Sequence, residues 1–291
     1  MSRTTAAGVA TVRLLCRTFG LSRQAYYAAR RPAPAPKVVR LPVRPAGAGA
    51  ETVLAAIRAI LEREPAWGVR TVWATLRREG LRVSRKRVWA LMHAHGLVLA
   101  VDREPGEAPP RGHVVVPAPN RRFATDLTTV WTRREGWVAV ALTIDCGCRT
   151  LLGLDVTKDQ SAPAILRSID AVLLELFGSP ARVPAGLELR SDHGPQYTGA
   201  DCEALVTRWG LTHTFAPVGR PTGNAVVERV IRTMKEEVVW LHDWEDAAHL
   251  WRELVAWQRR YNETRPHQAL GWQTPSEYRA AKLAAPAADA A

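Results

Sequence analysis

Three carboxylates that follow residue 120 of the chain are of the type that holds hard divalent cations. Asp192 follows an apolar run at 187–189 that predicts a strand ending in a turn. Glu228 comes after a gap of 35 residues, on a predicted helix. Asp126 lies within a strand-like run of Thr, Leu and Val, where burying a carboxylate is costly unless it is paired or binds a cation. Carboxylates that converge from separate elements repel one another. A pair of ions such as Mg²⁺ relieves that repulsion and can activate a water or hydroxyl for attack on a phosphodiester.

The helix expected around Glu228 has two distinct faces. Glu228, Arg232 and Lys235 recur at i, i+4 and i+7, so they share one face. The apolar residues recur at spacings of three and four, which predicts that the buried face is formed by Val227, Val230, Ile231, Met234 and Val238.

Several motifs occur together around these carboxylates. They are FATDLT, SDHGPQYTG, NAVVER with a lysine seven positions after its glutamate, and YNETRPHQAL followed by a Thr-Pro pair. With the 35-residue gap, they resemble the DDE transposase/integrase core and, within it, the second-frame product of the IS-three group of bacterial insertion sequences. The resemblance covers roughly residues 67–278.

This resemblance implies a ribonuclease-H-like core in which Asp126, Asp192 and Glu228 are catalytic and hold two Mg²⁺ (or Mn²⁺) ions. One ion would activate the nucleophile, first water and then a DNA 3′-hydroxyl, and the other would stabilise the departing 3′-oxygen. It also implies that Lys235, with Arg232 on the same face, contacts DNA near the element end. A plain helix-surface cation is the alternative for Lys235.

The apolar patterns predict an α/β core with a mixed five-stranded sheet, because three consecutive strands are followed by alternating helices and strands. Strands are expected at 122–132, 137–145, 149–156, 187–190 and 212–216, and helices at 161–177, at 200–209 and around Glu228. Asp243 is expected to cap a helix that runs to Tyr261, and Thr274 and Glu277 to form the capping box of a final helix.

Other polar residues near the expected site have structural interpretations. Asp145 and Asp155 are expected to be strand-end polar groups, and the closely spaced Cys146 and Cys148 to be structural. Three residues flank Asp192: His193, Gln196 and Tyr197. They are expected to shape the site or touch DNA, and structural support of the turn is an equally consistent role.

Positive charge is concentrated in the first part of the chain. The net charge is +12, and residues 1–120 hold 20 Lys and Arg against 7 Asp and Glu. This asymmetry favours nucleic-acid binding by the front half over a merely basic protein. Four cysteines without a regular framework indicate a reducing compartment, and no apolar run could span a bilayer. We therefore expect a soluble intracellular protein with no membrane partner. The resemblance to transposases of bacterial insertion sequences implies that it is cytoplasmic and nucleoid-associated.

Two small all-α modules of the helix-turn-helix kind are expected in this basic half. Residues 9–29 predict a helical pair in which Ser22 caps the second helix, although a plain helical hairpin is equally consistent. Residues 51–97 predict three helices, the third capped by Ser84, and resemble the segment that precedes the core in this transposase group. Cations in the first turn of that third helix are unfavourable because they oppose the helix dipole. Phosphate bound at this helix end would offset that cost, so we favour DNA contact over a solvated charged turn. The expected DNA contacts are Arg23, Gln24, Arg70, Arg85, Lys86 and Arg87.

The expected organisation follows from these segments. It comprises a small helical segment (1–31), a Pro/Ala/Arg linker (32–50), a helix-turn-helix module (51–100), a Pro-rich linker (101–119), the catalytic core (120–240) and C-terminal helices with a tail (241–291).

The expected function is that of a transposase which cuts and joins DNA at the ends of an insertion sequence. The expected partners are DNA (terminal inverted repeats and target), other copies of the chain, and an upstream-frame product as fusion partner. One rival is a catalytically silent, transposase-derived DNA-binding regulator, which the presence of Lys235 and all three carboxylates disfavours. The other is a ribonuclease-H-type nuclease without joining activity, which the SDHGPQYTG and YNETRPHQAL motifs disfavour.

Overall fold

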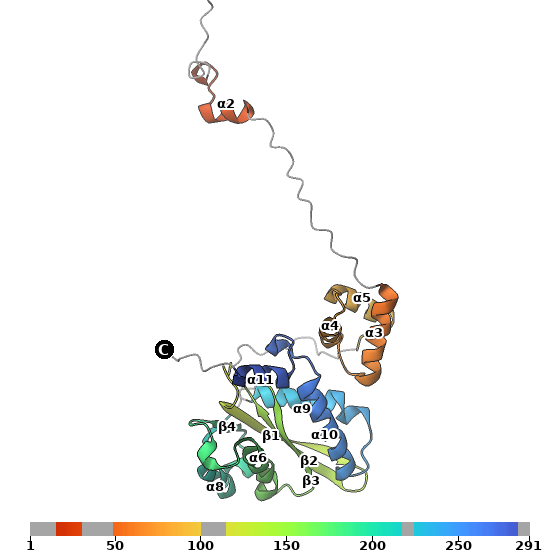
Figure 1. The fold of residues 1–291 in the computed structure, drawn as a ribbon, viewed down its shortest axis with the longest axis vertical. Coiled ribbons are helices and arrows are strands. Elements are labelled where there is room, and N and C mark those ends of the chain that lie inside the picture. The colour runs from red at the N-terminus through yellow and green to blue at the C-terminus, as the bar shows by residue number, and fades with distance from the viewer. Residues whose placement is uncertain (1–15, 31–48, 100–114, 217–223, 285–291) are drawn as a thin grey trace, which may run out of the picture. The chain divides into compact units, whose positions relative to one another are not determined.

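The computed structural model describes residues 16–30, 49–99, 115–216 and 224–284 (Figure 1). The chain divides into two compact units, Met1–Ala46 and Gly47–Ala291. In the first unit, helix α2 (Arg23–Arg30) is capped by Ser22, whose hydroxyl accepts a hydrogen bond from the Ala25 backbone N–H at 3.1 Å, as predicted. Most of the helix expected before it, and most of the two expected linkers, lie outside the described residues.

Three helices form a helical module in the second unit, as predicted: α3 (Ala50–Arg63), α4 (Val69–Arg78) and α5 (Arg85–Ala94). α3 ends before Glu64 because that residue precedes a proline and is disfavoured in helical conformation. The Ser84 hydroxyl caps α5 by accepting a hydrogen bond from the Arg87 N–H at 3.3 Å. The helices share one apolar core, formed by Val53, Ile57, Ile60, Trp67, Val72, Leu76, Val83, Val88 and Met92.

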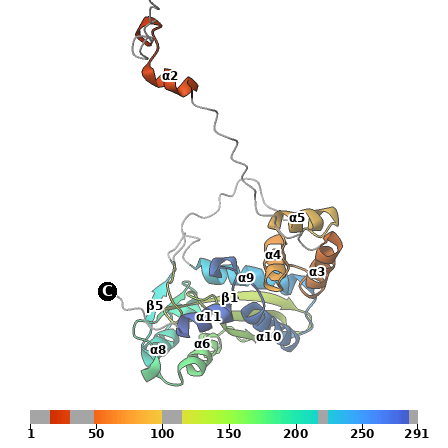
Figure 2. The ribbon, with the colours of Figure 1, turned by 45° about the horizontal axis from the view of Figure 1, so that its top comes forward.

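A mixed five-stranded sheet forms the centre of the second unit, as predicted (Figures 1 and 2). The strands are β1 (Arg122–Thr132), β2 (Gly136–Asp145), β3 (Leu151–Thr157), β4 (Glu188–Ser191) and β5 (Thr212–Phe215). Their order in the sheet is β3-β2-β1-β4-β5. The first three strands pair antiparallel, and β4 pairs parallel with both β1 and β5.

Helices cover both faces of this sheet (Figure 1). One face packs against α6 (Ala162–Phe177), the short α7 (Pro195–Thr198), which the sequence pattern did not predict, and α8 (Ala200–Trp209); the other packs against α9 (Ala225–Glu237) and α10 (Ala247–Glu263). Successive strand residues point to opposite faces. Ala124 and Val130 of β1 belong to the α9–α10 core, whereas Phe123 belongs to the α6–α8 core. Asp126, two residues after Ala124, therefore lies on the face that α9 covers.

The predicted cap of α10 is wrong. α10 begins after Asp246, whose side chain accepts a hydrogen bond from the His249 N–H at 2.8 Å. Asp243 is exposed and pairs instead with Arg133 at 2.8 Å. The reason is tertiary, because the β1–β2 turn donates backbone hydrogen bonds to the carbonyls of Trp244 and Glu245 and holds them outside the helix. The three 3₁₀ turns among the described residues are η1 (Pro180–Arg182), η2 (Val239–Leu241) and η3 (Gln268–Leu270).

The C-terminal helix α11 (Pro275–Ala284) is attached to the core through a buried carboxylate. Thr274 and Glu277 form the predicted capping box, with reciprocal hydrogen bonds of 2.9 and 3.2 Å. Arg279 of α11 donates to Asp145 at 2.8 Å, and Asp145 is completely buried. It also accepts hydrogen bonds from the backbone of Asn120 and Gly147, so this strand-end residue joins three segments. In the described part of the chain, no helix combines the length and apolar character that crossing a membrane requires.

Candidate active site

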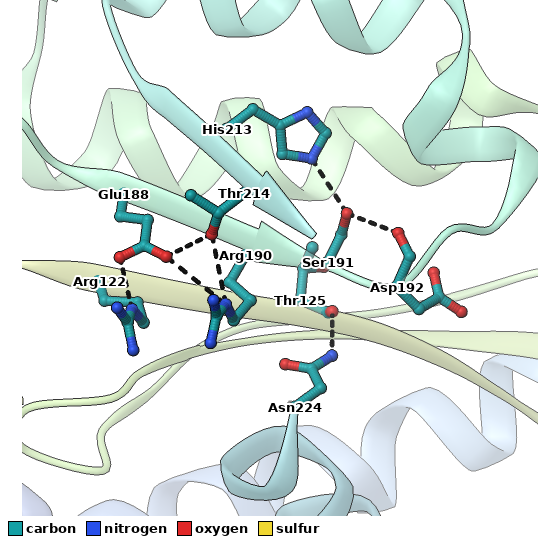
Figure 3. Close-up of polar contacts among 9 residues, drawn as sticks. All are labelled: Arg122, Thr125, Glu188, Arg190, Ser191, Asp192, His213, Thr214 and Asn224. Atoms are coloured by element: carbon teal, nitrogen blue, oxygen red, sulfur yellow. Dashed lines mark hydrogen bonds and ion pairs between the residues drawn. The ribbon is translucent and has the colours of Figure 1, made fainter. Parts of the chain in front are cut away.

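The register of the sheet brings Asp126 and Asp192 to equivalent positions. β1 and β4 run parallel, and Ala124 lies opposite Arg190. Two residues after this pair come Asp126, which is still within β1, and Asp192, which follows β4 directly. Neighbouring strands are about 4.8 Å apart, so Asp192, at the end of β4, comes beside Asp126 in the middle of β1. Figure 3 shows Asp192 at the end of its strand, next to Thr125 on β1.

Helix α9 carries the third carboxylate and starts beside the same part of β1. Its first residues are attached to β1 through Asn224, whose Nδ2 donates a hydrogen bond to the Thr125 carbonyl oxygen at 3.2 Å (Figure 3). Glu228 lies in the first turn, and its backbone N–H donates to the Asn224 carbonyl at 3.2 Å. Val227 is buried and Glu228 is exposed, as the predicted faces of this helix require.

Burial and the charges of the other two carboxylates both act on Asp126. The pKa of Asp126 is raised to about 6, first because burial penalises its charged form and then because Asp192 and Glu228 add negative charge. The Leu127 N–H and the charge of Lys235 act in the opposite direction on this pKa. Partial desolvation also raises the pKa of Glu228, although its side chain remains largely exposed. A cation at this site would remove the repulsion that raises the Asp126 pKa.

The donor set suits a hard divalent ion in kind, because all its ligands are carboxylate oxygens. Oδ1 of Asp126 accepts a hydrogen bond from the Leu127 N–H at 2.8 Å, and Oδ1 of Asp192 accepts one from the Gly194 N–H at 2.9 Å. These bonds orient the side chains and leave Oδ2 of each aspartate as the candidate ligand. As the side chains stand, no three His, Cys, Asp or Glu residues in the described segments form a group that could hold a metal ion.

The two cations predicted on the Glu228 face differ in their surroundings. Lys235 is half-buried, two turns after Glu228, and its charge reaches Asp126. Arg232 is exposed and pairs along the helix with Glu236 at 2.8 Å. The charge of Lys235 therefore acts on Asp126, whereas Arg232 forms an ion pair within α9.

The DNA contacts expected in the basic half lie on or next to the helices α2, α4 and α5. Arg85 and Lys86 are exposed in the first turn of α5. Arg87 beside them is half-buried, and Arg70 on α4 donates a hydrogen bond to Gln268 at 3.3 Å. Arg23 and the exposed Gln24 belong to the first unit.

Sequence reasoning missed several polar contacts that support the carboxylates (Figure 3). The Ser191 hydroxyl donates to the Asp192 carbonyl at 2.9 Å and lies 3.0 Å from Nε2 of His213. A hydroxyl has one hydrogen, so Nε2 of His213 is the donor to Ser191. His213 is on β5, 22 positions after Ser191, so no local pattern could reveal the pair.

A second polar group connects the three strands β1, β4 and β5 on the face of Asp126 (Figure 3). The Glu188 carboxylate pairs with Arg122 at 2.6 Å and with Arg190 at 3.5 Å, and it accepts a hydrogen bond from Thr214. Charge-assisted bonds across neighbouring strands fix their register. The register that aligns the aspartates is therefore held by side chains as well as by the backbone.

Comparisons with known proteins agree with this fold. Two models described as "Integrase core domain" match residues 116–221 and 209–275, together more than half of the chain. A model described as "HTH-like domain" matches residues 49–105. A solved intasome of simian T-cell lymphotropic virus, in complex with PP2A regulatory subunit B56 gamma, has a chain with a TM-score of 0.50 at 14% identity. The match covers 80% of this chain and 76% of that chain.

Curated relatives come from insertion elements. An uncharacterized 31.7 kDa protein of insertion element IS407 from Burkholderia multivorans is 28% identical over 227 residues, which are 77% of this chain and 79% of the relative. Transposase InsD of insertion element IS2 from Escherichia coli is 27% identical over 237 residues, which are 78% of this chain and 77% of the relative. With its ribonuclease-H-like sheet and the preceding HTH-like domain, the chain belongs to the integrase-core family of transposases and integrases.

Proposed function

We propose that this protein is a transposase that cleaves DNA at the ends of an insertion sequence and joins those ends to other DNA. Asp126, Asp192 and Glu228 would together hold two Mg²⁺ or Mn²⁺ ions. When bound, such ions supply activation of the attacking water or 3′-hydroxyl and stabilisation of the departing 3′-oxygen. The observation that supports the proposal is that the three carboxylate-bearing segments meet at one part of β1. Asp126 lies within β1, the strand before Asp192 pairs with it in parallel, and Asn224 at the start of α9 donates a hydrogen bond to Thr125.

The chain's own residues prepare this chemistry. The side chains of Asp126 and Asp192 are oriented by backbone N–H groups that bond Oδ1, and Oδ2 of each is the oxygen that would bind a metal. Asp126 must be deprotonated to bind an ion, and metal binding favours its charged form. Lys235 would bind a phosphate of the DNA that the carboxylates act on, as a point charge on the same helix face as Glu228.

The basic front half would supply most of the DNA affinity. Arg85, Lys86 and Arg87 in the first turn of α5 would contact phosphates, and Arg23, Gln24, Arg70 and Arg232 are further candidates. The proposed boundaries are those expected from the sequence, with the helix-turn-helix module at 51–100 and the catalytic core at 120–240. We further propose that the active complex contains several copies of the chain, that an upstream-frame product is fused to it, and that it acts in the cytoplasm on nucleoid DNA.

Substitution of single ligands tests the proposal. Asp126→Asn, Asp192→Asn and Glu228→Gln should each abolish cleavage and joining of oligonucleotides that carry the element ends. Each should leave DNA binding nearly unchanged, because each removes a hard anionic ligand without altering the basic front half.

Asp155→Asn is the matched control. Asp155 is also within a strand, and its Oδ1 also accepts a hydrogen bond from the next backbone N–H, at 2.9 Å, but it lies on β3. This variant should cleave and join like the wild type. Mg²⁺-dependent cleavage that persists in Asp126→Asn would remove that residue from the site. Wild-type protein that binds the ends but never cuts them would indicate a silent DNA-binding regulator.

A further inference from the structure

Thr125, the residue before Asp126, makes hydrogen bonds to both of the other carboxylate-bearing segments. Its side-chain oxygen donates to the Leu142 carbonyl at 3.0 Å and lies 3.3 Å from the Tyr197 hydroxyl. Its backbone carbonyl accepts the bond from Asn224 at 3.2 Å. The single hydrogen of the Thr125 hydroxyl goes to Leu142, so the Tyr197 hydroxyl is the donor in that pair. Figure 3 shows Asn224 approaching Thr125 from the α9 side of the strand.

Two partners of Thr125, Tyr197 and Asn224, are each within five residues of one of the other two carboxylates. Tyr197 lies on α7, in the segment that follows Asp192. Its backbone N–H donates a hydrogen bond to the Gly194 carbonyl at 2.9 Å. Gly194 in turn donates its N–H to Asp192. Asn224 is joined to Glu228 by the first hydrogen bond of α9. Three short paths therefore connect Asp126, Asp192 and Glu228 through one threonine.

The three residues of this network are almost entirely buried. Exposed fractions are 1% for Thr125, 1% for Tyr197 and 4% for Asn224. Burial raises the pKa of the Tyr197 hydroxyl, so it keeps its proton and remains a donor. A buried polar group without a partner is costly, so each of these hydrogen bonds constrains the positions of both segments that it joins.

Asn224 precedes helix α9, but its side chain does not cap that helix. Asparagine before a helix ordinarily accepts a hydrogen bond from the second or third backbone N–H of that helix. Here the Asn224 side chain makes no such cap, and its Nδ2 reaches into the sheet to Thr125. Its Oδ1 is buried without a hydrogen-bond partner among the described residues. This geometry gives up a local helix cap in favour of a tertiary contact one residue from Asp126.

We propose that Thr125, Tyr197 and Asn224 form a positioning network that sets the spacing of the three carboxylates and thereby their affinity for divalent metal. The proposal rests on the function proposed above. None of the three residues is assigned a contact with metal or DNA; each acts through the segment that carries a ligand. Groups that position metal ligands in this way typically change metal affinity about 10- to 100-fold when they are removed.

The test measures the affinity of the metal-free protein for Mn²⁺. The protein is titrated with MnCl₂, and the heat of binding is recorded by isothermal calorimetry. Tyr197→Phe removes the hydroxyl that donates to Thr125. Asn224→Leu removes the side-chain hydrogen bond to Thr125 and leaves a side chain of similar size. Each should weaken Mn²⁺ binding by about tenfold or more. Thr125→Val should have a similar effect, and Thr125→Ser, which keeps the hydroxyl, should restore most of the affinity. The Mg²⁺ concentration for half-maximal cleavage should rise in parallel.

Thr143→Val is the matched control. Thr143 lies directly opposite Thr125 in the β1–β2 register, is equally buried, and its hydroxyl has no hydrogen-bond partner in the described segments. This variant should bind Mn²⁺ like the wild type. Variants of Tyr197 and Asn224 that melt at lower temperature but bind Mn²⁺ normally would overturn the proposal, because their role would then be structural. A failure of the proposed function is a separate outcome, in which Asp126→Asn itself binds Mn²⁺ like the wild type.

Discussion

Replacing Asp126 by asparagine should make the metal-free protein more stable at neutral pH, although it destroys the proposed active site. The pKa of Asp126 is raised from its ordinary value of 3.8 to about 6. One pKa unit corresponds to about 1.4 kcal/mol, so the ionised carboxylate lowers the stability of the fold by about 3 kcal/mol. The asparagine side chain would carry no charge and would keep the oxygen that accepts the Leu127 N–H.

The stability gained by Asp126→Asn should increase as the pH rises. Because the pKa of Asp126 is higher in the folded state, the fold binds its proton more tightly than the unfolded chain does. Wild-type stability is therefore unaffected by this group below pH 3.8 and decreases as pH rises to about 6, after which the cost is constant. Asp126→Asn should accordingly exceed the wild type by about 3 kcal/mol at pH 8 and by a much smaller margin near pH 4.5.

Urea unfolding followed by tryptophan fluorescence measures this difference, because the chain contains 11 tryptophans. The measurements are made in EDTA at both pH values, with Asp155→Asn as the control for replacing an aspartate within a strand. Adding MgCl₂ should then stabilise the wild type and leave Asp126→Asn unchanged, because an ion that binds only the folded state stabilises it by mass action. An Asp126→Asn variant no more stable than the wild type at pH 8, or a gain equal at both pH values, would refute the electrostatic reasoning.

Three further predictions concern the DNA contacts and the C-terminal helix. Lys235→Ala should weaken binding to element ends and slow joining without changing the melting temperature; unchanged joining would show that this helix face does not meet DNA. The double substitution Arg85→Ala with Lys86→Ala should reduce the slope of log binding constant against log salt by about two, one for each phosphate that is no longer neutralised; an unaltered slope would leave both residues as solvated charges. Arg279→Met should cost about 3–5 kcal/mol in urea unfolding, because it leaves the buried Asp145 carboxylate without its ion pair; a destabilisation below about 1 kcal/mol, the range of an exposed pair, would contradict that assignment.

Local contacts made much of this protein predictable from sequence. Ser22, Ser84 and the Thr274–Glu277 box lie next to the helices that they cap, so a short window of sequence contains the whole interaction. The apolar face of α9 follows the same logic, because spacings of three and four place those residues on one side. The five strands and the helices expected at 161–177 and 200–209 have the predicted bounds within two residues.

Contacts between segments far apart in the chain decided the rest. α10 begins at Asp246 and not after Asp243, because the β1–β2 turn bonds the intervening carbonyls. Both residues are good caps by type, and only the packed turn distinguishes them. The buried Asp145 gained its role in the same way, from an arginine 134 positions later in the chain.

The candidate site shows this division most clearly. The sequence determined which carboxylates are present and, through their motifs, the family to which the chain belongs. The parallel register of β1 and β4 placed Asp126 beside Asp192, and the bond from Asn224 brought the start of α9 to the same strand. Thr125 carries no local signal of its role, because its partners are 72 and 99 positions away. Spacing along the chain is a poor guide to such contacts, since only the folded sheet brings their atoms within hydrogen-bonding distance.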